Sequence, residues 1–343
     1  MPVRLQFIVM SSGEDAALLS QLVEALDPWP VLIHQDASRP RLALPPMRSG
    51  VRWMQPSLAT GWGDWGFASA ISLSIADALR HGNFDYLQLL SPSCLPIRPL
   101  ADLIHHVSQD EADHHFDAFA LDRDRDTVMS FAWRAFAPSN SERQKLLSRL
   151  RRWYFGESPV LEQQHSMSLL HRQRPAYGTY SLRAGAAVAF TRAMALDRPS
   201  TRAACAVGSV WFGARRQVCE RMVEIAGSKQ IRKRFESLAM VDELMIPTLL
   251  MHAGHKAGPS NHAVSPFDAL GHPTPIDLPL LLKAASSQRF FARKFRPDPQ
   301  DACRRIALEW AGISAAQVSG ETLTSGRPEV RDFRSSPSGV PAG

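Results

Sequence analysis

Residues 84–97 read Phe-Asp-Tyr-Leu-Gln-Leu-Leu-Ser-Pro-Ser-Cys-Leu-Pro-Ile. The first seven residues form an apolar run of strand length, and the serines and prolines that follow end it sharply. A helix is expected after this turn, because Leu100, Leu103, Ile104 and Val107 recur at helical spacing. A buried strand that leads through a polar turn into a helix is the repeating unit of an α/β sheet.

The same unit occurs twice upstream. Residues 3–10 predict a strand, and the apolar positions of residues 18–26 predict the helix that follows it. Residues 31–33 predict a second strand that ends in His34-Gln35-Asp36, and residues 67–80 predict another helix. This alternation favours a mixed, mostly parallel sheet with helices on both faces. Ligands bind such sheets at the carboxyl ends of the strands, so the candidate site lies at these polar turns.

The second half of the chain contains two further predicted helices. The turn at residues 208–212 is expected to enter a helix that reaches Ile225. Val241 begins the other helix, and we expect Pro247 within its first turn, since deeper it would remove a hydrogen bond. Residues 320–343 are rich in glycine, serine, threonine, proline and arginine, which is typical of a disordered tail.

The composition is that of a globular protein with an excess of arginine. Of 343 residues, 45% are hydrophobic and 21% are charged, which excludes a disordered chain and a coiled coil. The 39 lysines and arginines exceed the 33 acidic residues by six, and only six of the 39 are lysines. Arginine suits phosphate or another polyanion, although a GC-rich coding sequence is the simpler explanation of the excess.

The cysteines and the hydropathy pattern predict a cytoplasmic protein. No pair among Cys94, Cys205, Cys219 and Cys303 has C-x-x-C spacing, which excludes a zinc ribbon and a thioredoxin motif. There is no secretory signal, and no apolar stretch approaches the roughly 20 residues that cross a bilayer. We therefore expect reduced thiols and a cytoplasmic location, with peripheral association at the inner face of the membrane as an open alternative.

Candidate metal ligands are few. A hard divalent metal needs carboxylate oxygens, and the turn Ser91-Pro92-Ser93-Cys94 has none. Residues 122–126 read Asp-Arg-Asp-Arg-Asp, where the arginines favour a self-paired charge run over a metal site, which stays open as the alternative. Neighbouring residues on a helix point in different directions, so we expect the pairs His105-His106 and His114-His115 to be surface or helix-end histidines.

A basic cluster lies near the C-terminus. Residues 289–296 read Arg-Phe-Phe-Ala-Arg-Lys-Phe-Arg. On a helix, Arg289 and Arg293 would share one face, where their guanidinium groups fit phosphate and Lys294 adds a charge. The alternative is a surface helix with a buried aromatic face.

Six short segments along residues 3–295 carry a family pattern in a fixed order. They are Ile33-His34-Gln35-Asp36, Gly61-Trp62-Gly63-Asp64-Trp65-Gly66, residues 86–97, Gly208-Ser209-Val210-Trp211-Phe212, Asp242-Glu243-Leu244 and Phe291-Ala292-Arg293-Lys294-Phe295. In this order they resemble motifs of the core-2/I-branching glycosyltransferases. That family contains branching N-acetylglucosaminyltransferases and peptide-O-xylosyltransferases and has many bacterial members.

The resemblance implies a GT-A-like fold and inverting, metal-independent sugar transfer. The implied donor is a UDP-sugar, with N-acetylglucosamine first and xylose next, and the implied acceptor is a hydroxyl of a glycan or glycolipid in bacterial polysaccharide synthesis. No cofactor and no metal are expected. The resemblance also implies one domain over residues 1–319, with a nucleotide-binding half at about 1–115 and an acceptor and catalytic half at about 116–300.

The resemblance assigns roles to individual residues. Glu243 would be the catalytic base, which takes the proton of the acceptor hydroxyl. The residues implied at the nucleotide-sugar are His34, Asp36, Gln55, Ser57, Tyr86, Arg289, Arg293 and Lys294. Trp211 and Phe267 would contact the acceptor. The simpler alternatives are a helix-start carboxylate for Glu243 and a core side chain for Trp211.

The sequence departs from the family pattern at several positions. Cys94 stands where the family usually has aspartate, and Phe212 replaces a second tryptophan. A further family arginine has no clear match, and Arg289 or His272 could substitute for it. Two other functions therefore stay open: a non-catalytic glycan- or nucleotide-binding protein on this fold and, less favoured, a basic nucleic-acid-binding protein, for which no motif is present. The oligomeric state is also open.

Overall fold

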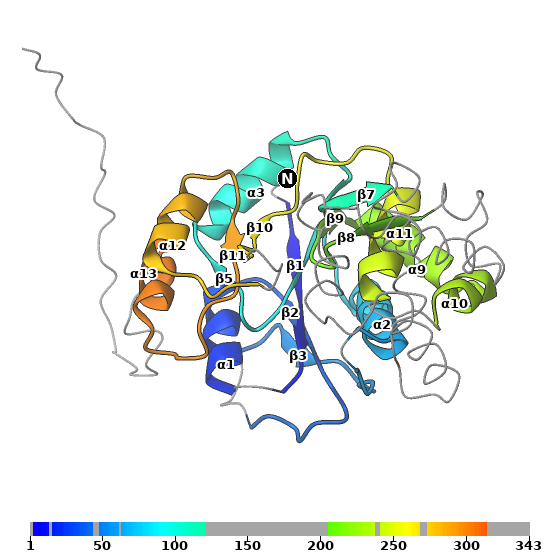
Figure 1. The fold of residues 1–343 in the computed structure, drawn as a ribbon, viewed down its shortest axis with the longest axis horizontal. Coiled ribbons are helices and arrows are strands. Elements are labelled where there is room, and N and C mark those ends of the chain that lie inside the picture. Colours follow the sequence, from blue (N-terminus) through cyan, green and yellow to red (C-terminus); the bar gives the residue numbers. More distant parts are fainter. Residues whose placement is uncertain are drawn as a thin grey trace, which may run out of the picture.

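The computed structural model describes residues 3–13, 16–43, 48–61, 63–120, 205–236, 241–267 and 273–313. Four expectations fall outside these ranges: the Asp122–Asp126 run, Trp62, His272 and the tail from residue 320. The described residues form three layers, with a sheet between two layers of helices (Figure 1).

A six-stranded sheet forms the middle layer. Its strands, in spatial order, are β3 (Val51–Trp53), β2 (Val31–Gln35), β1 (Leu5–Ser11), β4 (Tyr86–Leu90), β9 (Gly213–Arg215) and β6 (His114–His115). The first four are parallel, and β9 runs antiparallel to both of its neighbours. The expectation of a mixed, mostly parallel sheet is confirmed.

Helices cover both faces of this sheet. One layer holds α1 (Ala16–Ala25), α3 (Leu100–Gln109), α12 (Leu278–Ala285) and α13 (Ala302–Trp310), and the other holds α2 (Trp65–His81), α9 (Arg216–Ala226), α10 (Lys229–Phe235) and α11 (Asp242–Ala253) (Figure 1). Alternate residues of β1 enter two separate cores, Phe7 on the α1 side and Ile8 on the α2 side. None of the described helices combines the length and hydropathy of a membrane span.

Two smaller sheets accompany the central one. The first has the order β10 (Ala263–Val264), β11 (Phe291–Ala292) and β5 (Leu95–Pro96), and the second pairs β7 (Ala118–Ala120) with β8 (Ala206–Gly208). The expectation of a helix over residues 289–296 is therefore wrong. Phe290, Phe291 and Ala292 are consecutive and all buried, which is the pattern of a strand inside a core rather than of a one-sided helix.

Two further expectations need correction. The turn at residues 208–212 leads first into β9 and only then into α9, which starts at Arg216. Gly213 permits this strand to lie against β4, because a Cβ there would collide with the Tyr86 side chain. Pro247 is the sixth residue of α11 rather than part of its first turn. Because proline has no backbone N–H, residue 247 cannot donate the usual helical hydrogen bond to the carbonyl of Glu243, four residues earlier.

Candidate functional site

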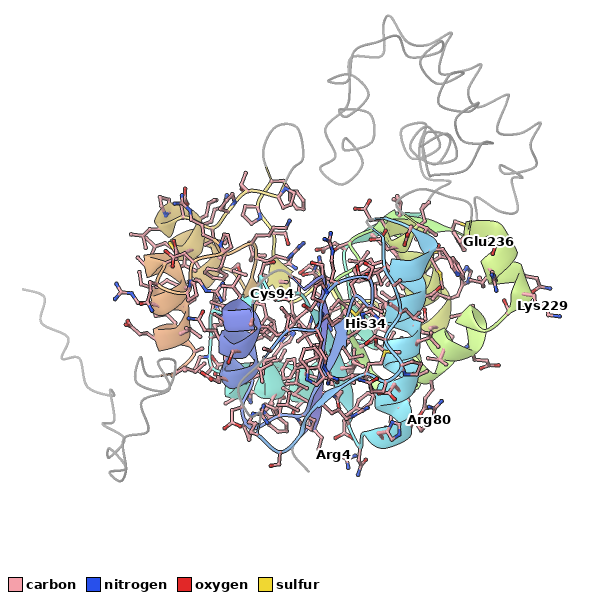
Figure 2. All side chains as sticks on the ribbon, turned by 90° about the horizontal axis from the view of Figure 1, so that it is seen from below. Arg4, His34, Arg80, Cys94, Lys229 and Glu236 are labelled. Carbon is pink, nitrogen blue, oxygen red and sulfur yellow. The ribbon has the colours of Figure 1, made fainter. Side chains whose placement is uncertain are left out.

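The carboxyl ends of β1, β2 and β4 lie along one edge of the central sheet. The register pairs Ser11 with Gln35 and Val9 with Leu90, so the residues that follow these strands share that edge. Figure 2 shows His34 and Cys94 toward the middle of the molecule, whereas Lys229 and Glu236 lie at its periphery. The polar residues that follow these three strands therefore lie along the same edge of the sheet, as the sequence predicted.

His34 and Asp36 hold a loop onto this edge. The ring Nε2 of His34, which is 1% exposed, accepts the backbone N–H of Leu58 at 3.1 Å. An Asp36 carboxylate oxygen accepts the N–H groups of Thr60 at 2.9 Å and Ser38 at 2.8 Å. Both side chains thus shape the loop over residues 57–60, and their role at a ligand would be to position that loop.

Their environments fix their charge states. Burial lowers the pKa of His34, which keeps the imidazole neutral, and the nearby Asp36 only partly opposes this effect. Burial alone would raise the pKa of Asp36, but the hydrogen bonds from Thr60 and Ser38 outweigh it and hold the pKa below its ordinary value. Of the other two residues predicted here, Gln55 is exposed, and the Ser57 hydroxyl donates to the Met54 carbonyl at 3.3 Å.

The turn after β4 is built from hydroxyl and thiol groups. Cys94 is 1% exposed, and its sulfur accepts the Ser91 N–H at 3.4 Å. The hydroxyls of Ser91 and Ser93 lie 2.9 Å apart, and the Ser93 carbonyl accepts the N–H of Phe295 at 3.0 Å. The turn that the sequence singled out for its lack of a carboxylate is therefore joined directly to the segment after β11.

Arg293 lies between that turn and Trp211. Its guanidinium carbon is 4.7 Å from the centre of the Trp211 ring, a cation–π distance. Burial lowers the pKa of Arg293, and the neighbouring Cys94 thiol only partly opposes this shift. The guanidinium stays protonated because its ordinary pKa lies far above neutral pH. A cation thus occupies the carboxyl end of β4. Lys294 follows it and is exposed, with its carbonyl accepting the N–H of Ile276 at 2.8 Å.

Glu243 lies in the first turn of α11, and the start of this helix is fixed to the same edge. The N–H of Val241 donates to the carbonyl of Gly63 at 3.2 Å, and the loop before Gly63 is the one held by His34 and Asp36. Glu243 is half-buried, and a helix N-terminus favours the ionised form of a carboxylate. The start of α11 and the stacked pair of Arg293 and Trp211 are therefore each linked to residues at the carboxyl ends of the central strands, α11 through the loop before Gly63 and Arg293 through Cys94.

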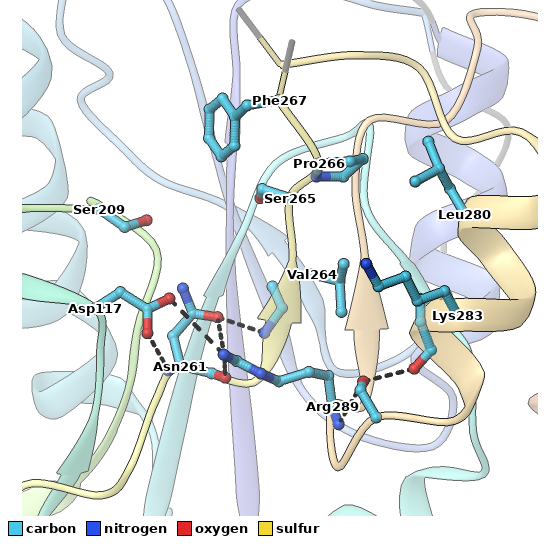
Figure 3. A pocket seen from close by; sticks show the side chains of 13 residues that line it. Asp117, Ser209, Asn261, Val264, Ser265, Pro266, Phe267, Leu280, Lys283 and Arg289 are labelled. Atoms are coloured by element: carbon cyan, nitrogen blue, oxygen red, sulfur yellow. Dashed lines mark hydrogen bonds and ion pairs between the residues drawn. The ribbon is translucent and has the colours of Figure 1, made fainter. Parts of the chain in front are cut away.

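Arg289 and Phe267 line a separate pocket of about 420 Å³ (Figure 3). The Arg289 guanidinium donates to the backbone and side-chain oxygens of Asn261 and lies 3.8 Å from an Asp117 carboxylate oxygen. Burial lowers the pKa of Arg289, and Asp117 opposes the shift. Lys283 adds a second cationic side chain to the lining. Arg289 thus lines this pocket and contacts Asn261, whereas Arg293 stacks on Trp211, so the two arginines have different surroundings and do not act as a pair.

Tyr86 is placed away from the other predicted site residues. It is the first residue of β4 rather than its last, and its side chain is fully buried. Its hydroxyl lies 2.8 Å from His115 Nδ1 and 3.0 Å from His262 Nε2. The structure therefore does not bring Tyr86 to the edge that carries His34 and Arg293.

One of the two histidine pairs differs from the expectation, whereas His105 and His106 lie at the surface and in the last turn of α3 as expected. His114 and His115 are buried on a strand, so the expectation of surface or helix-end positions is wrong for them. His106 lies in the last turn of α3, and its ring meets those of His115 and His262. Within the described residues these three form the one group of three or more His, Cys, Asp or Glu side chains whose ligand atoms lie close enough together to hold a metal ion. The sequence did not predict this group, because His262 is far from His106 and His115 along the chain.

Comparison with models of known protein families and with curated protein sequences gives no match. A stacked guanidinium and a neighbouring exposed lysine can bind a diphosphate, and a carboxylate at a helix start can take a proton. The polar side chains of the turn after β4 are hydroxyls and a thiol. Without a carboxylate, this turn does not supply the oxygen ligands that a hard divalent cation needs.

Proposed function

We propose that this chain is an inverting glycosyltransferase with a GT-A-like fold, which transfers a sugar from a UDP-sugar to a glycan or glycolipid hydroxyl. N-acetylglucosamine is the first candidate sugar and xylose the second. The observation that carries the proposal is the Arg293 guanidinium, stacked on Trp211 beside the Cys94 turn at the carboxyl end of β4. Metal-dependent transferases of this fold type use a carboxylate-bound cation at that strand end.

The charge of the leaving group explains why a cation is needed there. When the sugar departs, negative charge grows on the diphosphate, and a positive group fixed in advance stabilises it without reorganising. Arg293 is fixed by its ring stack and by its backbone N–H, which donates to the Val264 carbonyl at 2.9 Å. A guanidinium can bind two phosphate oxygens at once, and Lys294 adds a point charge.

Glu243 supplies the base in this proposal. Its carboxylate takes the proton of the acceptor hydroxyl while the hydroxyl oxygen attacks the anomeric carbon from the face opposite UDP. The bond to the diphosphate oxygen breaks with its electron pair, through an oxocarbenium-like state, and UDP leaves. One bond forms, one breaks, and the anomeric configuration inverts.

The pocket around Phe267 is the proposed acceptor region. Its volume of about 420 Å³ lies within the usual range for small-molecule sites, and an aromatic side chain can stack on a sugar ring. Val264 connects it to the donor side, because this lining residue accepts the backbone N–H of Arg293.

A UDP-sugar panel with chelator present tests the proposal. We expect UDP to raise the melting temperature, ADP to do so less, and one UDP-sugar to release UDP when a glycan acceptor is added. UDP binding that appears only with added manganese would contradict the expectation that binding and transfer need no metal ion. UDP binding without turnover of any sugar would favour the non-catalytic alternative, and no binding of UDP would contradict both.

A further inference from the structure

The histidines His106, His115 and His262 form a cluster on the sheet face covered by α3. They converge from the last turn of α3, from β6 and from the segment before β10. One ligand nitrogen from each lies within 4.8 Å of the other two. Tyr86, which contacts two of them, lies four residues before the carboxyl end of β4, or about 13 Å along the strand. The cluster is therefore separate from the proposed diphosphate position.

The polar contacts around His115 fix its tautomer. Its Nε2 lies 2.9 Å from an Asp110 carboxylate oxygen and must carry the proton to make that hydrogen bond. Its Nδ1 is then an acceptor, 2.8 Å from the Tyr86 hydroxyl. This arrangement, with a carboxylate behind one ring nitrogen and a lone pair on the other, is the usual one for metal-binding histidines.

A purely structural hydrogen-bond chain explains only part of the cluster. Such a chain runs from His262 through Tyr86 and His115 to Asp110, and every member is satisfied. It makes no use of His106, whose Nε2 lies 3.5 Å from the Asp110 oxygen, too long for a strong hydrogen bond. A metal site would use the imidazole of His106 as its third nitrogen ligand, whereas the hydrogen-bond chain is complete without it.

We propose that His106, His115 and His262 bind a divalent transition-metal ion, with zinc as the ion of first choice. Imidazole nitrogens suit zinc, copper and nickel, and three histidines with one oxygen ligand form a tetrahedral zinc site. The Tyr86 oxygen, which already lies within 3.0 Å of two of the rings' nitrogens, is the nearest fourth ligand.

The cluster needs only small movements to close on the ion. Zinc–nitrogen bonds of about 2.0–2.1 Å place tetrahedral ligand atoms about 3.3 Å apart, so nitrogens up to 4.8 Å apart must approach by about 1.5 Å. His106 is partly exposed and gives both the freedom for this rotation and an entry path. The carboxylate behind His115 is held in place, because Arg215 donates to the carbonyls of Val107, Asp110 and Ala112.

Cobalt and zinc binding to the full chain tests the site. We expect the metal-stripped wild type to take up one equivalent of Co²⁺ with the strong visible bands of a tetrahedral site, and zinc to displace it. His106→Ala should weaken Co²⁺ binding by more than 100-fold. Asp110→Asn should weaken it by about 10- to 100-fold, the usual effect of losing the carboxylate behind a ligand. His105→Ala is the matched control, since His105 is exposed on the same helix, and its binding should equal that of the wild type.

Circular dichroism and melting temperature are measured on every variant. His106 is the preferred ligand to replace, because it is the least buried of the three and its loss should leave the fold intact. A folded wild type that takes up no Co²⁺ or Zn²⁺ would overturn the proposal, as would a folded His106→Ala variant that binds as tightly as the wild type. These measurements use no UDP, so their outcome is independent of the transferase proposal.

Discussion

The guanidinium carbon of Arg293 lies 4.7 Å from the centre of the Trp211 ring. The two residues belong to different sequence motifs, and the resemblance assigned one to the donor and the other to the acceptor. In the structure they form one unit beside the turn after β4. Their stack limits the directions in which the guanidinium can point, so Trp211 should affect the binding of a diphosphate through Arg293.

This relationship predicts coupled effects on UDP affinity. Arg293→Met removes the charge but keeps the length of the side chain, and we expect it to weaken UDP binding by about 10- to 100-fold, the value of one charge-assisted hydrogen bond. Trp211→Leu should weaken it less. In the double variant the losses should not add, with a coupling energy of about 0.5–2 kcal/mol. Isothermal titration calorimetry measures each constant.

The control for this cycle is Arg232→Met, because Arg232 is an exposed partner of Glu236 on α10 and should have no effect on UDP. Additive losses would show that Trp211 and Arg293 act separately. An Arg293→Met variant that binds UDP like the wild type would remove Arg293 from the diphosphate site.

Lys294 should contribute to the diphosphate and not to the nucleoside. We expect Lys294→Ala to weaken UDP binding by about 10-fold and to reduce its salt dependence, while uridine binding stays unchanged. Lys229→Ala is the matched control, since Lys229 lies at the periphery in Figure 2. Competition titrations with UDP and uridine measure both constants, and an equal loss for the two ligands would indicate a general disturbance instead of a phosphate contact.

Glu243→Gln separates binding from chemistry. The amide keeps the size of the side chain but cannot take a proton, so transfer should fall by about 10²- to 10⁴-fold while UDP affinity is unchanged. Glu236→Gln, at the end of α10, should leave both quantities as in the wild type. Product formation and UDP titration are measured on the same preparations, and retained turnover would exclude Glu243 as the base.

The sequence predicted strands β1, β2 and β4 of the central sheet because their signals are local, whereas the short strands β3, β9 and β6 were not predicted. Strands β1, β2 and β4 are apolar runs that end at polar turns, and the helices between them have clear one-sided spacing. The polar residues at the strand ends then had to meet, since parallel strands end at one edge. Fold class and the position of the candidate site follow from these patterns alone.

The errors arose where tertiary contacts outweigh local pattern. The strand at Phe291–Ala292 is only two residues long, and its apolar neighbours fit a helix or a buried strand equally well until β5 and β10 are placed beside it. The histidine cluster could not be predicted, because His106 and His262 meet only through the fold. A buried Tyr86 with two histidine contacts has no local signature either.

The ion pair between Arg4 and Asp85 predicts a pH-dependent contribution to stability. Arg4 donates to the Asp85 carboxylate from its backbone N–H at 2.9 Å and from its side chain at 2.8 and 3.0 Å. These hydrogen bonds lower the pKa of Asp85 to about 2. Because the folded value lies below the unfolded value of about 3.9, the contribution is complete above that pH and is lost as the pH falls toward 2.

Asp85→Asn should therefore lower the free energy of unfolding at pH 7 by about 1 kcal/mol or less, since both side chains are more than a third exposed and solvent screens the pair. The difference between wild type and variant should shrink as the pH falls from about 5 to about 2, because protonation removes the carboxylate that the variant lacks. Urea unfolding midpoints measured across this range follow the difference directly. A gap that stays constant with pH would mean that the substitution acts through packing or backbone contacts, and that the charge of Asp85 contributes nothing.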